Sequence, residues 1–130
     1  MRLNINESEM LTEIAKIGSI SNKVGQAGNY FIFVYNNERA IPHFHIKEKT
    51  GTFSCCIKIK EADYYIHGKH KDILTKDLKK SLIYFLNSSE EPFTHITNFQ
   101  NIVMSWNNMN ENNKVNTSTM PDYEQLETIG

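Results

Sequence analysis

Three β-forming runs follow one another between residues 30 and 60, and only short turns separate them. Residues 30–35 are all aromatic or β-branched, and a run that is apolar on both faces is typical of a strand inside a sheet. Residues 36–38 supply a turn, and a second strand is expected from Pro42 or His43 to Lys47. Connections this short favour an antiparallel meander.

The third run, residues 52–60, follows a turn at residues 49–51 and alternates with the period of two that a strand requires. The set expected to point into the core is Phe53, Cys55, Ile57 and Ile59. The residues between them, Cys56 included, should then face outward. Residues 64–66 could add a short fourth strand.

Helical spacing of apolar residues marks three further segments. Residues 7–17 should form a first helix, and the glycine-containing stretch 18–29 should form a loop. A second helix is expected from a cap at Thr75 through residue 87, and a third over residues 97–107. The predicted class is therefore α+β, with a small antiparallel sheet of three to four strands and helices packed mainly on one face.

A chain of 130 residues fits one domain with a single core. We expect residues 1–108 to form this α+β domain and residues 109–130 to form a polar C-terminal tail. The stretch 107–116 is too polar to bury, so it would gain too little apolar contact to offset the entropy lost when its backbone becomes ordered. The tail should therefore be mobile unless Tyr123 and Leu126 anchor it to this molecule or to a second one.

Composition and charge limit the partners and the cellular compartment that are expected for this chain. A net charge of −1 gives no general attraction to nucleic acid. No apolar run approaches the roughly 18 residues that cross a membrane, and the N-terminus lacks the pattern of a signal peptide, so no membrane partner is expected. The only two cysteines, Cys55 and Cys56, are adjacent and poorly placed to pair with each other, which predicts a reduced, cytoplasmic setting.

Two histidines lie in the second expected strand, within the sequence Ile-Pro-His-Phe-His-Ile of residues 41–46. Because residues two apart in a strand share a face, His43 and His45 should point one way, and Phe44 and Ile46 should point into the core. Two imidazoles on one face can bind one metal ion, which makes His43 and His45 the candidate metal ligands. The candidate third ligands are His67, His70 and His95.

The alternative, which the sequence favours over metal, is that His43 and His45 line a solvated or partly buried face as hydrogen-bonding residues beside Lys47. Neither an HExxH nor a CxxC framework accompanies the pair. Histidine titrates near neutral pH, which leaves acid–base chemistry and contact with phosphate open.

Cys56 and the lysines also have two interpretations. A cysteine nucleophile needs a base within hydrogen-bond reach, and the sequence does not place His43 or His45 beside Cys56, so a structural role is favoured. Lysines gather between residues 58 and 80 and could form a nucleic-acid patch with His67 and His70. No arginine accompanies them, which argues against bidentate reading of bases.

The stretch 29–108 resembles a family of small bacterial domains of unknown function that are found near toxin–antitoxin loci. The features that carry the resemblance are residues 31–35, the motif at 41–46, the alternating strand at 55–59 and the helices that end at Trp106. Members of that family usually read Pro-Pro-His-Phe-His-Val or Pro-Pro-His-Val-His-Val at the motif, and here Ile41 replaces the first proline. The resemblance implies a bacterial α+β protein whose candidate functional site is the His-x-His motif, and it implies no particular activity.

Two functions follow from these observations. The favoured one is a non-enzymatic binding or regulatory module with a protein partner, associated with a toxin–antitoxin system and needing no cofactor. Its binding residues would be His43, His45, His67 and His70. The alternative is a small metal- or His-dependent hydrolase or nuclease that uses the His43/His45 strand. No acidic residue is spaced to activate water, which favours the binding module.

Overall fold

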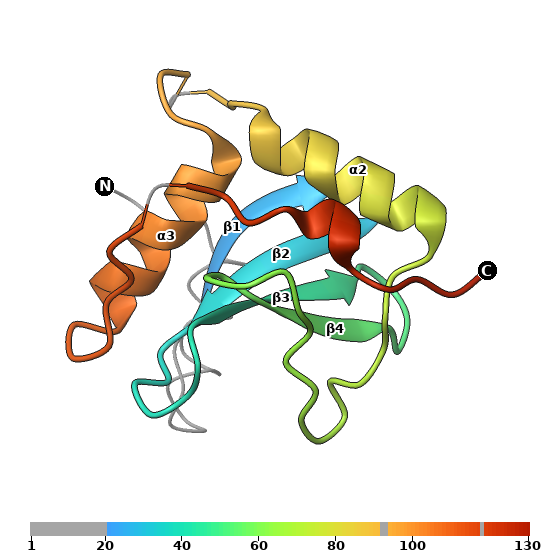
Figure 1. Ribbon diagram of the computed structural model, residues 1–130, viewed down its shortest axis with the longest axis horizontal. Coiled ribbons are helices and arrows are strands. Elements are labelled where there is room, and N and C mark those ends of the chain that lie inside the picture. The colour runs from blue at the N-terminus through green and yellow to red at the C-terminus, as the bar shows by residue number, and fades with distance from the viewer. Residues whose placement is uncertain (1–20, 92–93, 118) are drawn as a thin grey trace.

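A four-stranded antiparallel sheet in the order β1-β2-β3-β4 forms one layer of the protein (Figure 1). The computed structural model describes residues 21–91, 94–117 and 119–130. Its elements are β1 (Ser21–Ala27), β2 (Tyr30–Tyr35), β3 (His43–Glu48), β4 (Ser54–Lys58), α2 (Lys76–Asn87), α3 (Asn98–Met109) and the 3-10 helix η1 (Tyr123–Gln125). The predicted α+β class and antiparallel meander are confirmed.

The helices cover the sheet face on which Phe44 and Ile46 lie, as Figure 1 shows for α2, α3 and η1. Phe44 pairs with Ile57 and Ile46 pairs with Cys55 across β3 and β4, and all four side chains are buried. The helices contribute Leu82, Leu86, Phe99, Ile102 and Trp106 to the same core cluster. The prediction that Phe44 and Ile46 point into the core is confirmed.

Helix α2 begins directly after the predicted cap, and α3 begins one residue after the predicted start at residue 97. The Thr75 hydroxyl accepts a hydrogen bond from the amide of Leu78, and Thr97 and Gln100 form a capping box. The helix predicted at residues 7–17 lies outside the described part of the chain. Neither α2 nor α3 is long and apolar enough to cross a membrane.

The prediction of a loop over residues 18–29 is wrong, because residues 21–27 form strand β1 and pair with β2. The register shifts between Lys23 and Gly25, as in a β-bulge. A Cβ atom on Gly25 would collide with the ring of Phe85, so this glycine lets α2 pack closely against the strand. Gly28, with φ of +62°, turns the chain into β2. Glycine here serves close packing and a tight turn rather than a long loop.

The segment after α3 is packed against the domain. Tyr123 and Leu126 are buried in the main core cluster, so the chain supplies its own docking site for these two anchors. Asn110 and Val115 are buried too, and the expectation that their stretch is too polar to bury is wrong. The Asn110 side chain donates hydrogen bonds to the carbonyl of Tyr35 and to that of Trp106 in α3. Hydrogen bonds of this kind offset the free-energy cost of burying a polar side chain.

Replacing the buried Asn110 with alanine should lower the free energy of unfolding by about 1 to 3 kcal/mol, because the partly buried hydrogen bonds to the Tyr35 carbonyl and from the Asn37 amide are lost. Urea unfolding followed by circular dichroism measures the change. Asn116→Ala is the matched control, because Asn116 is exposed, and it should change stability by less than about 0.5 kcal/mol. Equal effects of the two substitutions would contradict this account of the C-terminal segment.

Candidate metal centre

The second face of the sheet carries His43 and His45 of β3, and both side chains are buried, with 2% and 5% of their surface exposed. The pairing of β3 with β4 places Cys56 directly opposite His45, and Cys56 is also buried. The expectation of a solvated or partly buried histidine face is therefore wrong. Cys56 lies on the face away from Cys55 and Ile57, as the alternation predicts, but this face is buried rather than exposed.

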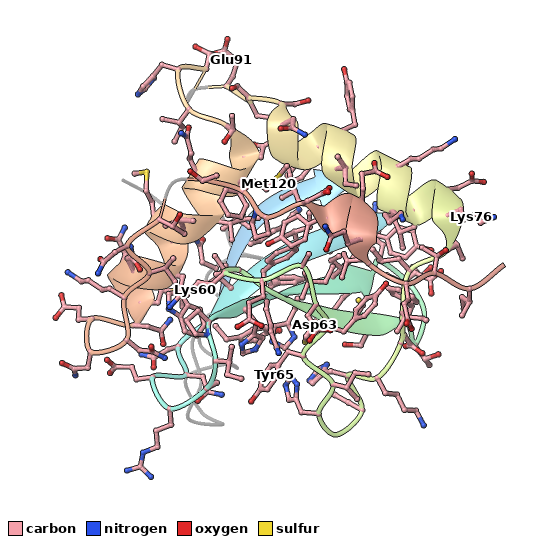
Figure 2. The ribbon with its side chains drawn as sticks, in the orientation of Figure 1. Lys60, Asp63, Tyr65, Lys76, Glu91 and Met120 are labelled. Atoms are coloured by element: carbon pink, nitrogen blue, oxygen red, sulfur yellow. The ribbon has the colours of Figure 1, made fainter. Side chains whose placement is uncertain are left out.

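Residues 64–70 bury this face because they fold back over β4. The amide of Tyr65 donates to the Cys56 carbonyl at 2.9 Å. In place of the fourth strand expected at residues 64–66, a single β-bridge joins Tyr64 to Ile57 of β4. His67 and His70 then join each other through two backbone hydrogen bonds around a tight turn. The labelled Asp63 and Tyr65 mark this segment in Figure 2.

The fold brings together the four predicted binding residues, His43, His45, His67 and His70. Ring centroids are 4.9 Å apart for His43 and His45, 4.7 Å for His45 and His70, and 4.8 Å for His67 and His70. The remaining candidate, His95, is exposed in the connection between α2 and α3. Cys56 joins the cluster, because its sulfur lies 3.2 Å from Nδ1 of His45.

Two of the histidines have a fixed tautomer. Nδ1 of His43 lies 2.7 Å from the Ile41 carbonyl, and Nδ1 of His67 lies 2.9 Å from the Tyr65 carbonyl. A carbonyl oxygen only accepts, so both Nδ1 atoms must carry the proton. Each ring is therefore left with an Nε2 lone pair, held in place by a backbone bond of the kind that orients metal-binding histidines.

His45 connects the pair to Cys56. Its Nε2 lies 3.1 Å from Nε2 of His43, and its Nδ1 faces the sulfur of Cys56. Since His43 Nε2 has no proton, the metal-free protein satisfies this contact when His45 donates from Nε2 and accepts from the Cys56 thiol. If a cation occupied the space between the two Nε2 atoms, the His45 proton would sit on Nδ1 and donate to the sulfur instead.

The cluster has the dimensions of a small metal site. One ligand atom from each of His43, His45, Cys56 and His67 can be chosen so that all lie within 4.8 Å of one another. Tetrahedral zinc with Zn–N distances of about 2.0–2.1 Å places its nitrogen ligands roughly 3.3 Å apart, close to the separation of the two Nε2 atoms. Nitrogen and sulfur donors suit zinc and its neighbours rather than magnesium or calcium.

Burial sets the protonation of these groups. It lowers the pKa of His43 to about 4 and that of His45 to about 2, and the neighbouring histidines lower the pKa of His45 further. The pKa of His70 falls to about 4 through burial, then through the charges of His67, Lys47 and Lys69. Burial raises the pKa of Cys56 to about 12, although Lys47 opposes the rise. At neutral pH these three imidazoles are neutral and the thiol keeps its proton.

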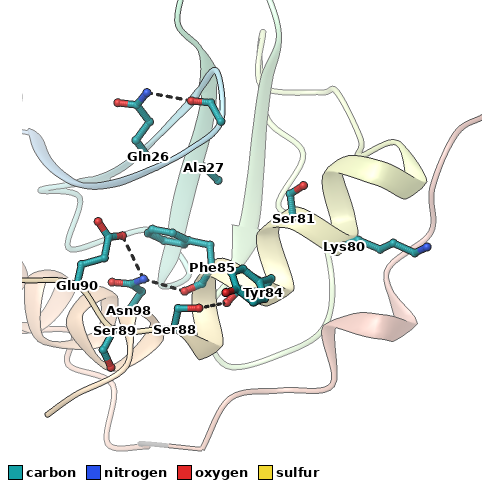
Figure 3. Close-up of a pocket in the computed structure, with 11 residues that line it drawn as sticks. Gln26, Ala27, Lys80, Ser81, Tyr84, Phe85, Ser88, Ser89, Glu90 and Asn98 are labelled. Carbon is teal, nitrogen blue, oxygen red and sulfur yellow. Dashed lines mark hydrogen bonds between the residues drawn. The ribbon is translucent and has the colours of Figure 1, made fainter. Parts of the chain in front are cut away.

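A separate hollow of about 630 Å³ lies between the β1–β2 turn and the C-terminal half of α2 (Figure 3). Its floor includes Asn98, whose side chain donates to the Phe85 carbonyl and to Glu90. No histidine or cysteine lines it. This hollow is therefore not part of the histidine cluster.

Comparisons of the chain with protein-family models, with curated proteins and with solved structures gave no significant match. The resemblance to the Pro-Pro-His-Phe-His-Val family stays a prediction. Function must accordingly be argued from the geometry of the cluster.

The metal-free protein should lose stability as the pH falls below about 6.5. The folded state holds His43 and His45 neutral with lowered pKa values, so the unfolded state binds more protons. Stability present above pH 6.5 is then lost as the pH falls, down to about pH 4 for His43 and about pH 2 for His45. Protonation of His43 and of His45 on unfolding should each lower the free energy of unfolding by roughly 2 kcal/mol at pH 5. Urea titrations in chelator at pH 7.5, 6 and 5 measure this. Unfolding free energies that stay constant down to pH 5 would contradict it.

Proposed function

We propose that the protein is a metal-binding module that holds one divalent transition metal ion, zinc in preference to harder cations, through Nε2 of His43, His45 and His67. The observation that carries the proposal is the bonding of Nδ1 in these rings. His43 and His67 donate from Nδ1 to backbone carbonyls, and His45 has Cys56 at the same position. Three imidazoles whose Nδ1 atoms are occupied have only Nε2 left for a shared cation.

Cys56 is assigned here as a hydrogen-bond partner of His45 rather than as a metal ligand. Its sulfur lies 3.2 Å from Nδ1 of His45, whereas Nε2, the other ring nitrogen, faces His43. Three protein ligands leave the fourth tetrahedral position for an exogenous ligand, whereas four ligands would close the site. The module therefore has a position at which a small ligand could bind.

A metal-dependent hydrolase is the second candidate, favoured by the open fourth position and by His70 beside the ligands. The ring of His70 packs edge-on against His45 with its centroid 4.7 Å away. A general base works best with a pKa near the working pH, and a pKa of about 4 makes His70 a weak base at neutral pH. This favours the binding module, and turnover of phosphate or carboxylate esters by the zinc-loaded protein, lost in His70→Gln, would support the hydrolase instead.

A regulatory role in a toxin–antitoxin pair is supported by the motif at residues 41–46 alone. The role requires a protein partner, and the product of the neighbouring gene is the first candidate to test for binding. Co-expression and co-purification with the neighbouring gene product measure the association directly.

Zinc should raise the melting temperature of the wild-type protein, because a ligand that binds only the folded state stabilises it by about 2.7 kcal/mol at a hundredfold excess over Kd. His43→Gln, His45→Gln and His67→Gln should each weaken zinc binding by more than about 100-fold, measured by calorimetry. His95→Gln is the matched control and should bind zinc like the wild type, because His95 lies outside the cluster. Protein that neither binds zinc nor changes its melting temperature with added zinc would refute the proposal.

Cys56→Ser should retain zinc with an affinity within about tenfold of the wild type, since a hydroxyl can accept the His45 proton in place of sulfur. The cobalt-substituted wild type should show no thiolate-to-metal charge-transfer band. Such a band, lost in Cys56→Ser, would instead mean four protein ligands and a closed site.

A further inference from the structure

The two edges of the sheet differ in what covers them. The edge at β4 is covered by residues 63–72, which form three backbone hydrogen bonds with that strand. At the other edge, β1 pairs with β2. Among the described residues, none forms a backbone hydrogen bond with the outer side of β1. An edge strand presents a row of N–H and C=O groups that forms a template for another strand.

Two hollows follow the β1 edge. The first is the hollow of about 630 Å³ beside the C-terminal half of α2, and residues 26–28 border it (Figure 3). The second, of about 350 Å³, is bordered by residues 22–24. Glu90 and Asn98 line both hollows, so the two are neighbours. Together they form a groove between β1 and the connection from α2 to α3, which we call the edge groove.

The edge groove has the layout that an added strand requires. Side chains on one face of a strand recur every two residues, so those of an added strand would reach the two hollows in turn. In complexes of this kind, main-chain hydrogen bonds to the edge strand supply affinity, and pockets for alternate side chains supply specificity. The edge groove offers both features along the length of β1.

The first hollow suits an apolar side chain. Ala27 and the buried Phe85 line it, and Tyr84, which is 78% exposed, stands beside them. Figure 3 shows Lys80 at one end of this hollow and Glu90 at the other. Aromatic rings next to open space provide large apolar contact area for a partner's side chain.

The part of the edge groove that both hollows share is acidic. Glu90 accepts a hydrogen bond from the Asn98 side chain at 3.2 Å, and a carboxylate has further lone pairs with which to accept from a ligand. Glu91 lines the second hollow as well. The ammonium of Lys23 stands 4.0 Å from the centroid of the Phe31 ring, on the opposite face of the sheet. Charge complementarity therefore favours a basic side chain at this position.

We propose that the edge groove binds an extended segment of another protein as an added strand. A lysine or arginine of that segment lies beside Glu90 and Glu91, and an aromatic or large aliphatic side chain lies against Phe85. The proposal does not rest on the metal site, because the edge groove and the candidate metal ligands have no residue in common.

A second copy of this chain is the other occupant that a sheet edge attracts, and charge argues against it. Two β1 strands paired around a two-fold axis would bring the acidic parts of both grooves to one seam, where like charges repel. The register shift between Lys23 and Gly25 also argues against self-pairing, because bulges are among the features that block edge-to-edge association.

The probe is a library of random peptides of about ten residues, displayed on phage and selected against the full chain. Enriched sequences should carry a basic residue and an aromatic or large aliphatic residue an even number of positions apart, since only these share a strand face. A synthetic, labelled copy of an enriched peptide is then titrated by fluorescence anisotropy. N-methylation of one set of alternate backbone amides should weaken binding at least tenfold, and methylation of the other set should leave binding within about threefold, because alternate amides of an added strand point toward β1.

Charge variants of the protein locate the bound peptide. Glu90→Gln/Glu91→Gln should weaken binding at least fivefold and reduce its dependence on salt. Glu111→Gln/Glu124→Gln is the matched control, since both glutamates are exposed and outside the edge groove, and it should bind within twofold of the wild type.

Three results would overturn the proposal: no peptide enriched by selection, equal effects of methylation in both sets of amides, or equal effects of the two double variants. A solution dimer in which the outward amides of β1 are protected from hydrogen exchange would overturn it too, because a second copy would then occupy the edge.

Discussion

The register between β3 and β4 is the constraint on which the rest of the structure depends. It pairs Phe44 with Ile57 on the core face and His45 with Cys56 on the other. Side chains alternate with a period of two, so a slip of one residue in β3 would put its imidazoles into the core and its apolar residues under the 64–70 segment. The burial of Phe44 and Ile57, both fully inaccessible, fixes the register and thereby positions His45 and Cys56 side by side. The histidine cluster is thus a consequence of core packing on the opposite face.

Much of this arrangement follows from the sequence, and the parts that do not have identifiable causes. Alternation within residues 52–60 and the two apolar faces of β2 are local patterns, and the structure has strands there. Strand β1 could not be recognised in the sequence because its glycine and polar residues are typical of a loop, while Gly25 is in fact required by the approach of Phe85. The histidine face was expected to be at least partly solvated because no local pattern reveals that residues 64–70 return to cover it. Cys56 was on the correct face by alternation, but its contact with His45 depends on the pairing register, which the sequence does not contain.

Prediction from the sequence also fails for the buried polar side chains near the C-terminus. Hydropathy alone makes residues 107–116 a poor candidate for packing, yet Asn110 is wholly buried. Its amide bonds the Tyr35 carbonyl and its oxygen accepts from Asn37, so the side chain replaces the backbone partners that the end of β2 lacks. Asn113 adds two further bonds: its backbone carbonyl accepts from the Trp106 indole, and its side-chain amide donates to the Ala40 carbonyl. Asparagine in this segment ties the end of α3 to the β2–β3 connection, a function that depends on geometry rather than on polarity.

Charge balance limits which ligands the proposed metal site could combine with its metal ion. Neutral imidazoles and a protonated thiol leave a bound divalent ion with its full charge, in a site where removing an ion from water is costly. Lys47 makes the surroundings more positive still, since its charge acts on both His45 and Cys56. A site of this kind binds a cation better when an anion is close by, and by linkage the anion then binds better beside the metal. A three-histidine site with an open fourth position would therefore hold its metal most tightly together with an anionic fourth ligand, and a closed structural zinc site has no position for one.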